Sequence, residues 1–130
     1  MQWDTSFESD IPVIDHEHRE LIDHIMRLQN EPNPERAKEI LLFLEDYVVK
    51  HFAHEQLMHR STNYPKAREH KETHLAFMDT VEALKTEYLE SGCSPVVLEK
   101  IVNALKVWLR DHILGADKEF AHYYRMLKDD

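Results

Sequence analysis

The sequence has little glycine, a single cysteine and no long apolar run. Only 2 of its 130 residues are glycine and 32% are charged, a mixture typical of long amphipathic helices rather than of a β-sandwich or barrel. The single Cys93 excludes an internal disulfide, which agrees with a reducing cytoplasm. No apolar run approaches the roughly 20 residues of a membrane span, and the acidic N-terminus does not resemble a signal peptide. We therefore expect a cytoplasmic protein without a membrane span.

Positive charge is also scarce, because 16 Lys and Arg face 25 Asp and Glu, for a net charge of -9 at pH 7. This balance argues against nucleic acid and anionic membranes as partners. No apolar stripe is obviously exposed, so a monomer is the expected state. The length suits one hydrophobic core, and we predict a single domain over residues 1–130.

Proline, glycine and asparagine divide the chain into helical segments at residues 30–34, 61–65 and 90–95. Between these breaks, apolar residues recur at alternating steps of three and four, as in the seams of a helical bundle. Short connections make consecutive helices antiparallel. The sequence therefore predicts an all-α, up-down-up-down antiparallel four-helix bundle with an N-terminal arm of about 11 residues and a short C-terminal helical tail. The expected helices cover residues 13–29, 34–60, 65–89 and 95–114, with the tail at about 116–127.

Polar residues occupy core positions in all four predicted seams. Histidine is the commonest metal-ligating side chain, and the chain has 10 of them. A buried imidazole or carboxylate costs several kcal/mol unless it is paired or bound to metal. Any one of them could be a satisfied core residue, but a metal site accounts for all of them together. The seam residues are His18, His51, Glu55, His70, His74 and His112.

The remaining five histidines lie off the seams or beyond them, and we expect them to be solvated. Two of them are close enough in sequence to the predicted ligands to support those ligands from behind, namely His16 and His54. The other three are His24, His59 and His122.

The spacing of the seam residues suits a pair of metals. His51 and Glu55 are four residues apart and therefore share a helical face, as do His70 and His74. A seventh candidate, Asp117, follows His112 by five residues, which on a regular helix rotates it by about 140°. Because Gly115 lies between them, we predict a local loosening such as a π-bulge that turns Asp117 inward. Seven ligands exceed the needs of one tetrahedral zinc and fit two metals bridged by carboxylates. Imidazoles and carboxylates without cysteine suit iron, manganese or zinc.

Four motifs together resemble the hemerythrin family, most closely its bacterial type, from Trp3 to about Tyr124. They are VIDHEH ending at residue 18, HFAHE at 51–55, NYPKAREHKETH at 63–74 and WLRDHILGAD at 108–117. Each motif alone is weakly specific, but all four in this order are highly specific. The fold implied by the resemblance is the same four-helix bundle, of which myohemerythrin is a standard example.

The resemblance implies two non-haem irons, cycling between Fe2+ and Fe3+, that bind dioxygen reversibly in a protein that is not an enzyme. An oxo or hydroxo group would complete the bridge between them. By the same resemblance, one closed iron would be held by His70, His74 and His112, and one open iron by His18 and His51. Both irons would be bridged by Glu55 and Asp117. The walls of the oxygen pocket would be Phe52, Trp108, Leu109 and Ile113, which could equally be plain core residues.

Two positions depart from the bacterial pattern: Glu17 stands where glutamine is usual, and Gln56 where a second glutamate is common. Neither replaces a ligand, and Glu17 would change the charge near the open iron. A ferritin-type site is disfavoured, since it needs two Glu-x-x-His pairs and only Glu119 and His122 have that spacing. A peroxide- or nitric oxide-reducing enzyme and an oxygen or redox sensor joined to an output module stay open. A structural zinc bundle is disfavoured, because seven ligands in a bridged arrangement exceed its needs. A free-standing oxygen carrier, store or delivery protein is favoured.

Overall fold

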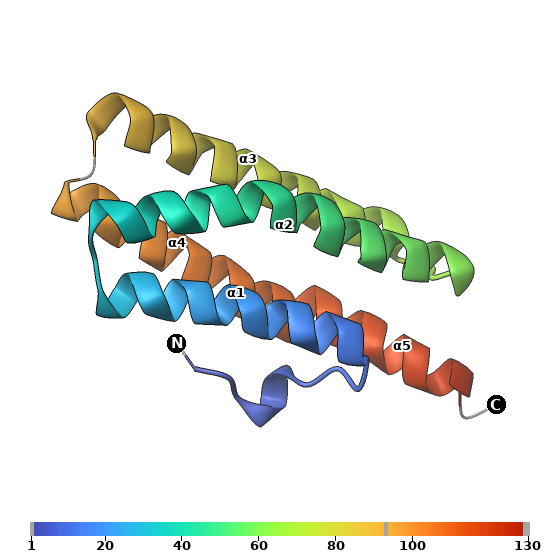
Figure 1. Ribbon diagram of the computed structural model, residues 1–130. Helices are drawn as coiled ribbons and strands as arrows, with labels where there is room; N and C mark the ends of the chain where they lie inside the picture. The colour runs from blue at the N-terminus through green and yellow to red at the C-terminus, as the bar shows by residue number, and fades with distance from the viewer. Residues whose placement is uncertain (1, 93, 129–130) are drawn as a thin grey trace.

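The fold is an antiparallel bundle of four long helices, seen in a computed structural model that describes residues 2–92 and 94–128 (Figure 1). The predicted all-α bundle is confirmed, and α5 continues the line of α4. Cys93 lies outside the described residues. In chain order the elements are η1 (Thr5–Phe7), α1 (Pro12–Asn30), α2 (Pro34–Ser61), α3 (Ala67–Ser91), α4 (Pro95–His112), the π-helical turn η2 (Ile113–Asp117) and α5 (Lys118–Lys128).

The helix ends follow from local hydrogen bonding. The side chain of Asn33 accepts a hydrogen bond from the backbone N–H of Arg36 at the start of α2, and Ser94 accepts one from Val97 at the start of α4. Gly92 ends α3 with φ of 73°, a left-handed conformation that glycine adopts without strain. These caps set the lengths of the helices, and so which residues face one another across the bundle.

Helix α3 begins two residues later than the sequence predicts, at Ala67 rather than at residue 65. The intervening residues form a turn in which the backbone N–H of Tyr64 donates to His59 O at 2.9 Å. Asn63 takes a left-handed φ of 52°, which asparagine tolerates better than most residues. The turn buries the Tyr64 ring at the end of the bundle.

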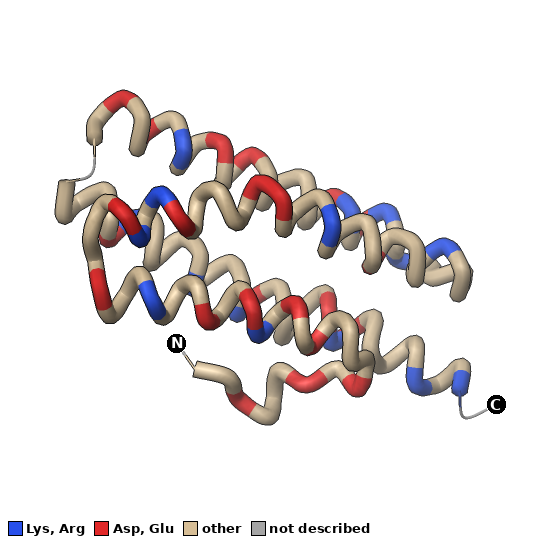
Figure 2. Tube along the Cα trace, in the orientation of Figure 1, with Lys and Arg blue, Asp and Glu red and all other residues tan. Residues whose placement is uncertain are grey.

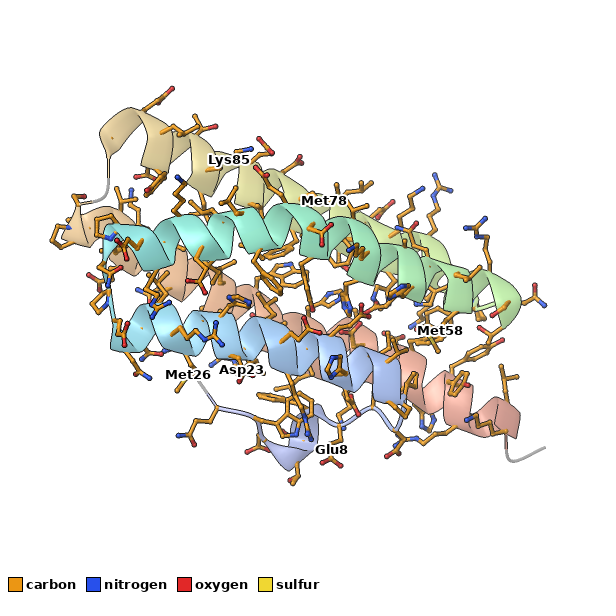
Figure 3. The ribbon with its side chains drawn as sticks, viewed as in Figure 1. Glu8, Asp23, Met26, Met58, Met78 and Lys85 are labelled. Carbon is orange, nitrogen blue, oxygen red and sulfur yellow. The ribbon has the colours of Figure 1, made fainter. Side chains whose placement is uncertain are left out.

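The core consists of two apolar clusters with a polar layer between them along the helices. Side chains fill the space between the four helices (Figure 3). The larger cluster includes Leu21, Leu44, Phe77 and Leu105, and the smaller one contains Ile11, Ile14, Tyr64 and Phe120. On α1 and α3 the predicted metal ligands lie between residues of the two clusters, whereas His51 on α2 and His112 on α4 lie between residues of the larger cluster. Water is therefore excluded from the polar layer on both sides.

The N-terminal arm is acidic (Figure 2) and is fixed to basic side chains of α1 and α5. Arg19 lies over the Trp3 ring, 4.4 Å from its centroid, and 3.9 Å from the Glu8 carboxylate. Arg125 donates to Asp10 at 2.9 Å. None of the helices in the described part of the chain combines the length and apolar character needed to cross a bilayer.

Candidate metal centre

The π-helical turn after α4 brings Asp117 to the same side of the helix as His112. The predicted π-bulge is confirmed over Ile113–Asp117, and Asp117 is only 5% exposed. A π-turn holds more residues per turn than an α-helix, so a residue five positions on returns to the same face. A Cβ added at Gly115 would meet nothing within 4 Å. The bulge therefore does not depend on glycine at that position.

The structure brings all seven predicted ligand residues into one buried layer, where each is at most 5% exposed. Helix α1 contributes one of them, and α2 and α3 contribute two each. The remaining two are His112, the last residue of α4, and Asp117, the last residue of η2. Their ligand atoms form two groups within which all lie inside 4.8 Å of one another. The groups are Glu55, His70, His74, His112 and Asp117, and His18, His51, Glu55 and Asp117.

Glu55 divides its two oxygens between these groups. Its Oε1 lies 2.8 Å from Nε2 of His51 and 3.8 Å from Nε2 of His18. Its Oε2 lies 2.8 Å from Nε2 of His70 and 3.2 Å from Nε2 of His74. One carboxylate thus faces two sets of imidazole nitrogens from opposite oxygens, which is the arrangement of a bridge between two cations.

The two oxygens of the Asp117 carboxylate also face different groups. Its Oδ2 lies 2.9 Å from Nε2 of His18, and its Oδ1 lies 3.1 Å from Nε2 of His70 and 3.2 Å from Nε2 of His112. The two carboxylates therefore define the same two positions, one with three histidines and one with two.

The donor atoms fit metal ions better than they fit one another. Both Glu55 oxygens and the Nε2 atoms of His18, His70, His74 and His112 are buried with no partner in hydrogen-bonding geometry among the described residues. Buried polar atoms nearly always have hydrogen-bond or metal partners, so such a cluster indicates that these residues bind a cation. Five imidazoles with two carboxylates, and no thiolate, suit first-row divalent metals such as iron.

Without metal, the cluster strongly perturbs its own protonation. Burial alone would lower the pKa of His51, but Glu55 and Glu17 raise it to about 10. Burial likewise opposes protonation of His70, yet Asp117 and Glu55 raise its pKa to about 9. Burial raises the carboxyl pKa values, but the imidazoles outweigh it and hold the pKa of Glu55 well below its usual range, and that of Asp117 below as well. The carboxylates are therefore charged and ready to bind cations.

Two side chains that were not predicted from the sequence, Thr73 and Tyr47, lie against the metal ligands on the side away from the proposed metals. Thr73 donates through Oγ1 to the backbone oxygen of His70 at 2.6 Å, and the same Oγ1 lies 3.3 Å from Nδ1 of His112. The Tyr47 ring stacks on His51 with centroids 5.0 Å apart, which shields that ligand from solvent. Tyr47 precedes His51 by four residues on α2. This spacing places both residues on the same helical face, so the contact could have been predicted from the sequence.

Glu17 holds the outer nitrogen of His51. Its Oε1 lies 3.1 Å from Nδ1 of His51, and its Oε2 lies 2.9 Å from Nδ1 of the half-exposed His54. Burial would raise the pKa of Glu17, but the hydrogen bonds from the two histidines lower it overall. Glutamate at position 17, where bacterial hemerythrins usually have glutamine, thus places a charged carboxylate against the predicted ligand His51. His54 contacts that carboxylate rather than a ligand, while His16 pairs with Glu20 at the surface.

The expectation that His59 is solvated is wrong, because its side chain is buried at 2% exposure. It lies against His70, Tyr64 and Phe120, with ring centroids 4.5, 5.1 and 4.5 Å away. Its position four residues after Glu55 places it on the same inward face. His24 is also partly buried, stacked on Phe43 at 3.8 Å, whereas the side chains of the other three histidines in that set are exposed.

The four residues predicted to wall an oxygen pocket lie in or against the larger apolar cluster. Phe52, Leu109 and Ile113 are buried, while Trp108 is partly buried. Phe52 stacks on His74 with centroids 3.8 Å apart, and Trp108 stacks on His112 at 4.4 Å. Trp108 also lines a groove of about 680 Å³ between α3 and α4. These side chains shield the three-histidine position, and their role as an oxygen pocket stays a prediction.

The geometry agrees with the comparison to known families. A family model for the hemerythrin HHE cation binding domain matches residues 9–124, which is most of the chain. The chain belongs to the hemerythrin family. Its family membership and the buried cluster together indicate a metal site.

Hemerythrin-family relatives span nearly the whole chain. A myohemerythrin of Theromyzon tessulatum is 32% identical over 120 residues, which is 92% of this chain and 89% of the relative. A bacteriohemerythrin of Clostridium acetobutylicum is 28% identical over 125 residues, which is 91% of this chain and 96% of the relative. A hemerythrin-like protein of Naegleria gruberi is 30% identical over 119 residues, 91% of this chain and 88% of the relative.

Proposed function

We propose that this protein binds two iron ions, bridged by Glu55 and Asp117, and takes up dioxygen reversibly as a carrier, store or delivery protein. The observation that carries the proposal is the division of both carboxylates between two sets of histidines. When bound, a pair of irons with an oxo or hydroxo bridge would supply the two electrons that reversible oxygen uptake requires.

The two metal positions differ in their number of protein donors, which supports dioxygen binding at only one of the two irons. Three imidazoles and two carboxylate oxygens face one position, and two imidazoles and two carboxylate oxygens face the other. The chain therefore offers five donor residues at the first position and four at the second, so the iron that His18 and His51 would hold is the one that could take up dioxygen. The chain itself supplies the fixed donors, while Phe52, Leu109 and Ile113 help to keep bulk water away.

The first experiment is anaerobic reduction of the purified protein, followed by visible spectroscopy as oxygen is added and then removed, with iron determined per chain. We expect two irons per chain and a charge-transfer band that appears with oxygen and disappears without it. The Glu55→Gln variant should lose paired iron, while Glu69→Gln, at an exposed site on α3, should retain it.

Two other outcomes separate the alternatives. Two irons that pass directly to a stable oxidised form would contradict oxygen carriage and favour a redox sensor or an enzyme that reduces peroxide or nitric oxide. Failure to load two irons per chain would contradict the di-iron proposal and favour a structural metal bundle. That the protein is a cytoplasmic monomer, and that residues 1–130 form one domain, stay predictions from the sequence.

A further inference from the structure

Glu17 joins two helices beside the two-histidine position. It lies on α1 directly before His18, and its carboxylate is only 13% exposed. Its Oε1 accepts a hydrogen bond from Nδ1–H of His51 on α2 at 3.1 Å. The same carboxylate is within 2.9 Å of Nδ1 of His54, whose side chain is 48% exposed. His51 is thereby held from behind, with its Nε2 directed to Glu55.

No described carboxylate lies against the Nδ1 atoms of the other four histidine ligands in this way. Nδ1 of His112 is near the neutral hydroxyl of Thr73. Nδ1 of His18, His70 and His74 has no hydrogen-bond partner among the described residues. Within the described part of the chain, a carboxylate therefore supports one ligand of the two-histidine position and no ligand of the three-histidine position.

A carboxylate behind a ligating imidazole has two separable effects. It fixes the tautomer and the orientation of the ring, and it increases the electron donation of the imidazole. Its negative charge, partly removed from solvent, also favours the more positive oxidation state of a nearby metal. The first effect needs only a hydrogen-bond acceptor, whereas the second needs the charge.

We propose that Glu17 is a positioning residue that orients His51 and lowers the reduction potential of the metal held by His18 and His51. This inference rests on the proposed di-iron function and names a residue that sets its redox balance. His54 holds the carboxylate from the solvent side and so keeps it directed at His51. The two metal positions would then differ in charge as well as in ligand number.

The test is a spectroelectrochemical titration of the iron-loaded full chain without oxygen. Glu17→Gln retains an oxygen that can accept the His51 hydrogen bond but removes the charge. We expect unchanged iron content and an Fe3+/Fe2+ ratio at least tenfold lower at a fixed potential, which is a rise of about 59 mV for one electron. Glu17→Ala removes both effects, so it should also lower metal affinity by about 10–100-fold in competition with a chelator.

The matched control is Glu20→Gln, which removes the same charge from α1, where Glu20 pairs with the exposed His16 at 2.9 Å. This variant should shift the potential by no more than a third of the Glu17→Gln shift. Equal shifts in the two variants, or no shift in Glu17→Gln, would overturn the proposal. Because oxygen is absent from the titration, failure of reversible oxygen uptake does not affect this result.

A second measurement uses only the wild type, so it tests the proposal even if the variants fold poorly. In the zinc-loaded wild type, nitrogen-15 NMR should show that the Nδ1–H of His51 exchanges slowly with solvent because it is hydrogen-bonded to the Glu17 carboxylate. A His51 ring bearing its proton on Nε2, or one whose Nδ1–H exchanges as fast as that of an exposed histidine, would contradict the assigned contact.

Discussion

Replacing His59 by leucine tests how the buried histidine layer responds to acid. Burial and the neighbouring His70 lower the pKa of His59 from 6.5 to about 4. In the folded state the ring therefore stays neutral at pH values where the unfolded chain binds a proton. Stability supplied by the neutral ring is fully present above about pH 6.5 and is lost as the pH falls toward 4.

The size of the effect follows from the shift. A difference of about 2.5 pKa units corresponds to about 3 kcal/mol of unfolding free energy at pH 4, and about 1.4 kcal/mol has been lost by pH 5.5. Leucine has no proton to bind, so His59→Leu should not show this part of the acid loss. Above pH 7 the variant should match or exceed the wild type, because it removes two buried nitrogens that have no hydrogen-bond partner among the described residues.

The assay is urea unfolding of the metal-free wild type and variant at several pH values from 8 to 5. Protonation of the metal ligands is common to both proteins and largely cancels in the difference between their free energies of unfolding. The control is His122→Leu at an exposed position of α5, where the difference from wild type should stay constant. If wild type and His59→Leu lose stability in parallel down to pH 5, the argument from burial is wrong.

Three further predictions concern the centre itself. Asp117→Ala should abolish paired metal binding, whereas Gly115→Ala should leave metal content unchanged because its Cβ has free space; metal analysis of both variants distinguishes a needed carboxylate from a needed glycine. Metal loading near pH 7 should release about two protons from His51 and His70, whose pKa values are about 10 and 9 without metal; calorimetry in buffers of different ionisation enthalpy measures the release, and none would contradict the raised values. Trp108→Ala should lower the free energy of unfolding by about 3 kcal/mol, because the ring stacks on Phe77 with centroids 3.7 Å apart. Urea titration measures the loss, and a value under about 1 kcal/mol would contradict the packing role of Trp108.

Local spacing accounts for much of what could be predicted. The three-and-four seams and the proline and glycine breaks predicted the helices to within about two residues, because caps and periodicity act over one turn. The pairs His51 with Glu55 and His70 with His74 also follow from one turn of helix. The inward turn of Asp117 required more than periodicity, and there the five-residue spacing from His112 and the intervening Gly115 together indicated the π-bulge.

Periodicity and the ordered motifs were enough to predict the helices, the residue types on their inner faces and the family. Three contacts between helices could be read only from the folded protein: which oxygen of Glu55 faces which histidine, the burial of His59 against His70, and the contact of Glu17 with His51. The reason is physical. Helical periodicity fixes the direction of a side chain about its own axis, whereas contacts between α1 and α2 depend on how the two helices shift and rotate against each other, which the packing of the whole core decides.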